Sequence, residues 1–205
     1  MTKIKICGLT NLDDSMECIR LGVDYLGFIF AQSPRRADPK IVSDIRRSIG
    51  PSVTMVGVFT EESDEVLQIV DECSLDLVQL HGGQSEQFAK RIGSDRVIRV
   101  IKVSDSDSLN EINYYTTAKH YLLDTYSKSL QGGTGSAWEW TMLSQMHVFD
   151  KDIILAGGLN PDNIYEAILT THPFAVDVSS GVESSPGKKD FVKLERLVRN
   201  VNECN

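Results

Sequence analysis

Short apolar runs alternate with helix-like stretches along the whole chain. Between the runs, apolar residues recur every three or four positions, which is the spacing of an amphipathic helix. Strand and helix alternate eight times, and this order predicts an α/β fold: a single (β/α)8 TIM barrel domain over residues 1–205. The runs that resemble buried strands are Lys3–Cys7, Tyr25–Phe30, Thr54–Phe59, Leu75–Leu80, Val97–Val103, His120–Asp124, Asp152–Ala156 and Phe174–Val178. The helical patterns are Leu12, Met16 and Ile19; Ile41, Ile45 and Ile49; Val66, Ile69, Val70 and Cys73; Ile164, Ala167 and Ile168; and Leu194, Leu197, Val198 and Val201.

Polar and proline residues mark where several helices are expected to begin. Asp38-Pro39 and Asn160-Pro161 each predict an N-cap followed by proline at the first helical position. Thr10 with Asp13 resembles a capping box. The fifth and sixth helices, Leu109–Tyr115 and Trp138–Met146, have the weakest patterns.

Polar side chains fall on one face of three predicted strands. They are Lys3, Lys5 and Cys7 on the first strand, Gln79 and His81 on the fourth, and Asp177 and Ser179 on the eighth. Alternate residues of a barrel strand face the lumen, where an unpaired ammonium group is costly. We therefore expect Lys5 to pair with a carboxylate, either Asp177 or Asp124.

Two glycine-centred stretches follow the seventh and eighth predicted strands: Ala156-Gly157-Gly158-Leu159 and Ser179-Ser180-Gly181-Val182. Glycines allow main-chain N–H groups to approach an anion closely. Barrels of this class often bind phosphate with the loops after these two strands. The two stretches therefore predict one phosphate site.

Composition and charge narrow the function further. A net charge of −8 and a pI near 5.0 argue against a nucleic-acid partner. The first residues lead directly into a strand pattern and no apolar run is long enough for a membrane span, so we expect a cytoplasmic protein. The four cysteines form no Cys-x-x-Cys pair, and the histidines have no ligand spacing, so no metal site is predicted.

Three side chains at predicted strand ends are candidates for proton transfer. Cys7 would otherwise be a packed cysteine, but at the barrel mouth its thiolate could act as a base or nucleophile. Asp124 precedes a polar loop, Thr125 to Thr134, that could close as a lid, although a carboxylate there can also serve as a cap. His81 could shape the pocket or transfer a proton.

Further basic residues leave other interpretations open. Arg35 and Arg36 follow the second strand, where either could bind a carboxylate or remain solvated. Lys102 could form a Schiff base in a lyase or aldolase, although an outward, paired lysine is the commoner state. A barrel that binds a phosphorylated ligand without catalysis is a third interpretation.

Taken in order, these segments resemble the phosphoribosylanthranilate isomerase family over essentially the whole length. The matching segments are Lys5-Ile6-Cys7-Gly8-Leu9-Thr10, Gly27-Phe28-Ile29-Phe30, Ser33-Pro34-Arg35, Val56-Gly57-Val58-Phe59, Val78-Gln79-Leu80-His81-Gly82, Leu122-Leu123-Asp124, Gly132-Gly133-Thr134-Gly135, Ala156-Gly157-Gly158-Leu159-Asn160-Pro161 and Asp177-Val178-Ser179-Ser180-Gly181-Val182-Glu183. The first and last of these make the resemblance specific.

The resemblance implies an Amadori rearrangement in tryptophan biosynthesis, with N-(5-phosphoribosyl)anthranilate as substrate and no cofactor. Cys7 matches the family's general base and Asp124 its general acid. The implied substrate-binding residues are Arg35 for the anthranilate carboxylate, His81 and Asp177 for the sugar, Gly133 and Gly135 in the mobile loop, and Gly157, Gly158, Ser179, Ser180 and Gly181 for the phosphate. Other enzymes of the pathway stay open as partners.

Overall fold

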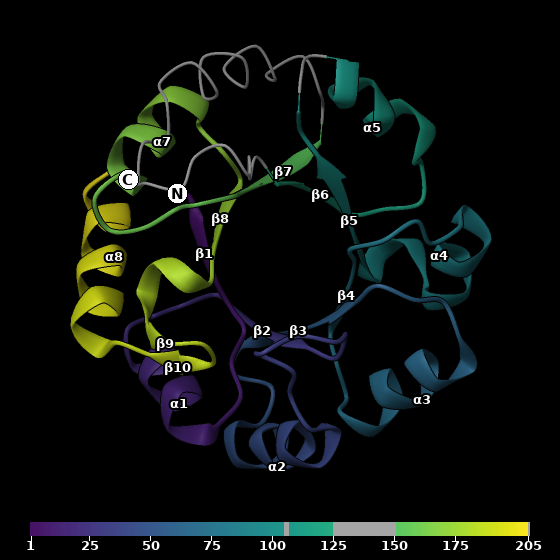
Figure 1. Cartoon of the computed structure of the whole chain (residues 1–205), viewed down its shortest axis with the longest axis horizontal. Helices are drawn as coiled ribbons and strands as arrows, with labels where there is room; N and C mark the ends of the chain where they lie inside the picture. The colour runs from purple at the N-terminus through teal and green to yellow at the C-terminus, as the bar shows by residue number, and fades with distance from the viewer. Residues whose placement is uncertain (105–106, 125–150, 205) are drawn as a thin grey trace.

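Eight parallel strands close into a ring with helices around its outside. The computed structural model describes residues 1–104, 107–124 and 151–204 of the chain. Each strand of the ring pairs with the next one along the sequence, and β8 (Ala175–Val178) pairs back onto β1 (Lys3–Cys7). Figure 1 shows the strands around the centre of the view and the helices outside them. The predicted (β/α)8 barrel is therefore confirmed.

The strands lie within two residues of their predicted positions. The remaining strands of the ring are β2 (Tyr25–Ile29), β3 (Thr54–Phe59), β4 (Leu77–Leu80), β5 (Val97–Lys102), β6 (His120–Asp124) and β7 (Asp152–Ala156). The helices are α1 (Leu12–Arg20), α2 (Pro39–Ile49), α3 (Asp64–Glu72), α4 (Glu86–Ile92), α5 (Glu111–Tyr114), α7 (Ile164–Thr171) and α8 (Phe191–Glu203). The helix expected over 138–146 lies outside the described residues.

Alternation along the strands creates two apolar cores. The smaller core fills the lumen of the ring and contains Tyr25, Val56, Leu77, Ile98, Val100, Leu122, Ile154, Ala156 and Ala175. The larger core packs the outer faces of the strands against the helices. Lys5 is fully buried, and its Nζ lies 2.9 Å from Asp177 Oδ1. The expected lumen ion pair is confirmed, with Asp177 as the partner.

Helix α2 begins as the sequence predicts, whereas α1 begins one residue later than expected. Asp38 caps α2 by accepting from the Lys40 amide, and Pro39 is the first helical residue. The N-cap of α1 is Asn11, whose side chain accepts from the Asp14 amide at 2.8 Å. The expected box of Thr10 and Asp13 is therefore wrong, because the Thr10 hydroxyl donates instead to the Gly187 carbonyl oxygen.

The start of α7 is also later than predicted. Its N-cap is Asn163 and its first residue is Ile164, so Asn160-Pro161 does not cap the helix directly. Instead, the Asn160 side chain accepts from the Asp162 amide and closes a turn that leads into the helix. The Asn-Pro pattern identified a real turn, three residues before the helix itself.

Helix α1 turns a different face inward from the one its apolar pattern predicts. Leu12 and Met16 are exposed, whereas Asp14, Ser15 and Cys18 are buried. The small residues allow close packing against the barrel, and the Asp14 carboxylate accepts from the Lys189 amide at 2.8 Å. Packing and this hydrogen bond therefore outweigh the apolar stripe as determinants of the helix orientation.

A short hairpin follows the last barrel strand. A 3-10 turn, η4 (Ser180–Val182), leads into β9 (Glu183–Ser185), which pairs with β10 (Lys188–Lys189) in antiparallel orientation. Gly187 in the turn has a φ of +79°, a conformation that glycine adopts without strain. Figure 1 shows the hairpin beside α1, between the last barrel strand and α8.

Candidate active site

Most of the predicted site residues line one cavity at the carboxyl ends of the strands. This cavity has a volume of about 230 Å³. The predicted residues on its wall are Cys7, His81, Asp124, Gly157, Gly158, Asp177, Ser179 and Ser180. They come from β1, β6 and β8 and from the segments that follow β4, β7 and β8. Because β8 pairs with β1, residues from the N-terminal and C-terminal parts of the sequence line the same cavity.

Cys7 ends β1 on the lumen side, above the Lys5–Asp177 ion pair. Its side chain is almost fully buried, and burial raises the pKa of the thiol, while Lys5 and Lys189 oppose that rise. Gly27 on β2 leaves room for the sulfur, since an added Cβ at that position would lie 2.9 Å from Sγ. The sulfur is therefore held in a confined position between neighbouring strands.

The Lys5 ammonium remains charged beneath the cavity. Burial alone would lower its pKa, but the charges of Asp177 and Cys7 outweigh this effect and raise the pKa. The positive charge thus persists next to the sulfur, where it favours the thiolate over the thiol.

Asp124 and His81 face each other across the cavity. His81 Nε2 lies 3.7 Å from Asp124 Oδ2, and the Gln79 amide nitrogen lies 3.3 Å from His81 Nδ1. With the amide as donor, Nδ1 accepts and the ring proton is on Nε2, directed towards Asp124. Burial lowers the pKa of His81, although Asp124 and Asp177 oppose the shift. A neutral imidazole therefore stands beside the carboxyl group.

The two glycine-centred loops form one side of the cavity. Gly157 and Gly158 both have positive φ values, +98° and +63°, which turn the chain sharply after β7. Gly181 does not line the cavity, but an added Cβ there would collide with the Leu159 carbonyl oxygen. It therefore allows the loop after β8 to approach the loop after β7.

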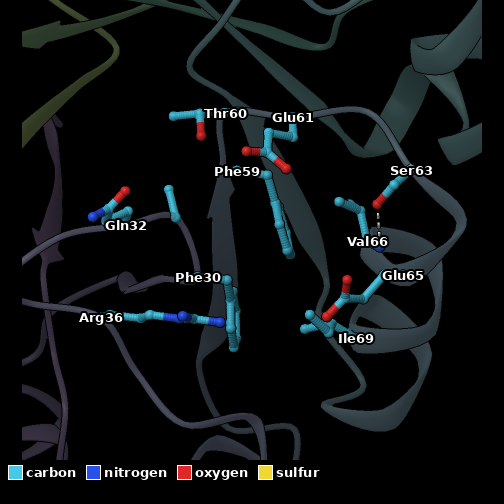
Figure 2. Close-up of a pocket in the computed structure, with 11 residues that line it drawn as sticks. Phe30, Gln32, Arg36, Phe59, Thr60, Glu61, Ser63, Glu65, Val66 and Ile69 are labelled. Carbon is cyan, nitrogen blue, oxygen red and sulfur yellow. Dashed lines mark hydrogen bonds between the residues drawn. The ribbon is translucent and has the colours of Figure 1, made fainter.

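The two arginines after β2 lie in different environments. Arg35 crosses the Gly8 backbone next to Ser179, where an added Cβ on Gly8 would lie 2.8 Å from Arg35 Cδ. Arg36 lines a second cavity of about 220 Å³, over the stacked rings of Phe30 and Phe59. Figure 2 shows Arg36 pointing towards Phe30 in that cavity. Phe30 and Phe59 belong to the larger core, between the strands and the helices. Of the two, only Arg35 lies beside the site of Cys7.

The Arg35 guanidinium is held by Glu183 of the hairpin. Its Nε donates at 2.9 Å to Oε1, and one terminal nitrogen donates to Oε2 at 2.7 Å. Glu183 also accepts from the Lys189 ammonium at 3.0 Å. Burial would raise the pKa of Glu183, but these two cations outweigh it and lower the pKa. Sequence reasoning missed Lys189 as a site residue, because its partners are distant along the chain.

Some of the predicted site residues lie outside the described part of the chain. Gly133, Gly135 and the expected lid over 125–134 are not among the described residues. Lys102 is exposed at the end of β5, on the lumen side of that strand. Within residues 1–104, 107–124 and 151–204, no group of three His, Cys, Asp or Glu residues could hold a metal ion. No helix in that part of the chain is long and apolar enough to cross a membrane.

Comparison with known proteins gives a consistent result over the whole chain. A family profile described as N-(5'phosphoribosyl)anthranilate (PRA) isomerase matches residues 4–200. The N-(5'-phosphoribosyl)anthranilate isomerase of Pelobacter propionicus is 43% identical over 201 residues, which cover 97% of this chain and 95% of that protein. The corresponding protein of Geotalea uraniireducens is 44% identical over 201 residues, covering 97% and 98%.

Solved structures of such isomerases also match nearly the whole chain. The crystal structure of phosphoribosyl anthranilate isomerase from Thermotoga maritima matches with a TM-score of 0.90 and 35% identity, covering 99% of this chain and all of that one. A second crystal structure of such an isomerase, in complex with reduced 1-(o-carboxyphenylamino)-1-deoxyribulose 5-phosphate, has a TM-score of 0.88 and 34% identity over 99% and 100% of the chains.

Proposed function

This chain belongs to the N-(5'-phosphoribosyl)anthranilate isomerase family, and from that premise we propose how its residues carry out the reaction. The enzyme converts N-(5-phosphoribosyl)anthranilate into 1-(2-carboxyphenylamino)-1-deoxyribulose 5-phosphate, a step of tryptophan biosynthesis. In the proposed mechanism, Asp124 is the general acid and Cys7 the general base. The observation that carries the proposal is that both side chains line one cavity with the two glycine-centred loops.

Asp124 acts first, by protonating the ribose ring oxygen. The ring C–O bond then breaks while the anthranilate nitrogen donates its lone pair, so that a protonated Schiff base forms at C1. The carboxyl group at the end of β6 is partly exposed to the cavity, where the ring oxygen would lie. The neutral His81 next to it can donate a hydrogen bond to the carboxylate left after proton transfer.

Cys7 acts second, by removing the proton from C2. The positive imine nitrogen withdraws electrons from the adjacent carbon, which makes this proton acidic enough for a thiolate to remove. The resulting enolamine then tautomerises to the ketone product. The buried Lys5 ammonium supports the base, since it lies on the same strand face and favours the thiolate.

Substrate binding is proposed to use residues from several loops around the cavity. Main-chain groups of the loops after β7 and β8 would hold the phosphate, at Gly157, Gly158, Ser179, Ser180 and Gly181. Arg35 would bind the anthranilate carboxylate, with the guanidinium edge that Glu183 does not occupy. His81 and Asp177 would contact the sugar, and Gly133 and Gly135 belong to the proposed mobile loop. The cytoplasmic location and other pathway enzymes as partners stay predictions.

The test is turnover of enzymatically generated N-(5-phosphoribosyl)anthranilate, followed as loss of its fluorescence. We expect Cys7→Ser and Asp124→Asn each to lower kcat by roughly 10²- to 10⁴-fold, because each removes a proton-transfer group, while KM changes little. Matched controls are Cys204→Ser and Asp162→Asn, which change residues on the outer helical side and should keep parental kinetics. If both site variants retain near-parental kcat, the acid and base assignment is wrong.

A further inference from the structure

Lys189, on β10, binds three oxygen atoms through one buried ammonium group. Its Nζ donates to the Cys7 carbonyl oxygen at 2.7 Å, to the Ser179 carbonyl oxygen at 3.2 Å and to Glu183 Oε1 at 3.0 Å. The side chain has no solvent exposure. An ammonium group has three N–H donors, so these three acceptors use all of them.

The three acceptors belong to different parts of the proposed mechanism. Cys7 carries the base at the end of β1, and Ser179 begins the loop proposed to bind phosphate. Glu183 holds Arg35, the proposed carboxylate clamp. A single nitrogen therefore connects three segments that serve different parts of the substrate in the proposed mechanism.

The hairpin itself is fixed independently of this ammonium group. The main-chain amide of Lys189 donates to the Asp14 carboxylate, and the Thr10 hydroxyl donates to the Gly187 carbonyl oxygen at 2.7 Å. The Lys193 side chain also donates to the Glu183 carbonyl oxygen at 2.9 Å. The hairpin backbone thus has anchors that would remain after substitution of the Lys189 side chain.

We propose that Lys189 is a positioning residue for this reaction, one that fixes the distance between the base on Cys7 and the phosphate site at Ser179. The inference rests on the proposed roles of those two residues. Proton removal from C2 depends on where the sulfur lies relative to a substrate anchored by its distant phosphate. A displacement of about 1 Å at a reacting group can lower a rate roughly 10²-fold.

The ammonium group also has an electrostatic effect on the base. The charged groups that face the Cys7 sulfur are Lys5 and Asp177 from the barrel strands, Lys189 from the hairpin and Arg35 from the loop after β2. Lys189 lowers the pKa of the thiol against the effect of burial. Its removal should therefore raise that pKa, so that a higher pH is needed to form the thiolate.

The principal experiment compares Lys189→Met with Lys188→Met. Lys188 is the exposed neighbour on the same strand, and its substitution should leave kcat, KM and pH dependence at parental values. For Lys189→Met we expect kcat to fall roughly 10- to 100-fold, by a larger factor than KM rises. We also expect the acidic limb of the kcat/KM profile to move to higher pH by roughly half to one unit.

The pH profile separates positioning from general stabilisation. A side chain that only stabilised the fold would change the thermal midpoint and the active fraction, without moving the limb assigned to Cys7. The proposal would be overturned if Lys189→Met kept kcat within about twofold of the parent and its acidic limb within about a tenth of a pH unit. Failure of the parent to turn over N-(5-phosphoribosyl)anthranilate would instead refute the proposed function, so the two failures are distinguishable.

A second variant keeps the charge and changes only the geometry. Lys189→Arg retains a cation next to Cys7, but each nitrogen of a planar guanidinium has at most two N–H groups, so no single nitrogen can donate to all three acceptors. We expect this variant to keep the parental pH limb while kcat falls at least about tenfold. If Lys189→Met does not fold, this comparison decides the question, and parental kcat in Lys189→Arg contradicts the proposal.

Discussion

At the scale of single residues, the site places charges in pairs around the Cys7 thiol. Lys5 is matched by Asp177, and Glu183 is matched by Arg35 and Lys189. Buried charges are costly unless they are paired and hydrogen-bonded. The pairs therefore allow fully buried cations, Lys5 and Lys189, to lie next to the thiol.

A residue-scale prediction concerns His120, at the opposite end of the lumen. Its ring stacks on Phe174 with the ring centres 5.0 Å apart, and Nδ1 lies 3.3 Å from Asp152 Oδ2. Burial lowers the pKa of His120, and the nearby Asp152 opposes the shift. The folded state therefore holds the imidazole neutral at pH values where the unfolded chain, with an ordinary histidine pKa of about 6.5, takes up a proton.

The sign of the effect follows from this difference. The stability from neutral His120 is fully present above about pH 6.5, and it is lost as the pH falls towards the lowered pKa of the folded state. Urea midpoints at about pH 7.5 and about pH 5.5 should differ less in His120→Gln than in the parent. The exposed Gln68 on α3 provides the control, since Gln68→Asn changes no titratable group and should keep the parental difference. An equal or larger difference in His120→Gln would show that burial of His120 does not contribute.

At the scale of elements, much of the fold could be predicted from periodicity. Strands have sharp apolar boundaries, so β1, β3, β6 and β7 have the predicted bounds. The inward faces of α7 and α8 were also predicted, because their buried apolar residues recur at helical spacing. The face of α1 was not, because its orientation depends on a hydrogen bond between Asp14 and the distant Lys189.

Helix α8 provides the prediction at this scale. Its N-cap, Asp190, accepts from the amides of both Val192 and Lys193 at 3.1 Å. Asp190→Ala leaves these amides without their capping acceptor, so we expect a loss of about 1 kcal/mol in the free energy of unfolding. Asp95→Ala, in the turn before β5, is the comparison and should cost less. Urea denaturation measures both, and a loss in Asp190→Ala no greater than in Asp95→Ala would contradict the assigned cap.

At the scale of the whole molecule, the ring makes every strand depend on two neighbours. β1 lies between β2 and β8, so the first and last parts of the chain share one sheet. The positions of Cys7 and Asp124, the proposed catalytic pair, could be predicted from the sequence, since both residues end strands. The hairpin contacts could not, because Lys188-Lys189 reads as two surface lysines until the fold brings Cys7 and Ser179 to one of them.

The closed ring also predicts how the protein unfolds. We propose that residues 1–205 form one domain, because no strand can leave the ring without breaking pairs on both sides. Heating should therefore give one transition, with the same midpoint by far-UV circular dichroism and by calorimetry, and equal calorimetric and van't Hoff enthalpies. Two resolved transitions, or a van't Hoff enthalpy well below the calorimetric one, would show separate unfolding units.

Ring closure finally affects the order in which the protein can mature on the ribosome. Of the eight barrel strands, the one carrying Cys7 is synthesised first, but one of its edges stays open until β8 emerges with Asp177, the counter-ion of Lys5. A prematurely terminated chain therefore keeps an open strand edge and an unmatched lysine, and both invite aggregation and degradation. The site around Cys7 can therefore form only after β8 has been synthesised.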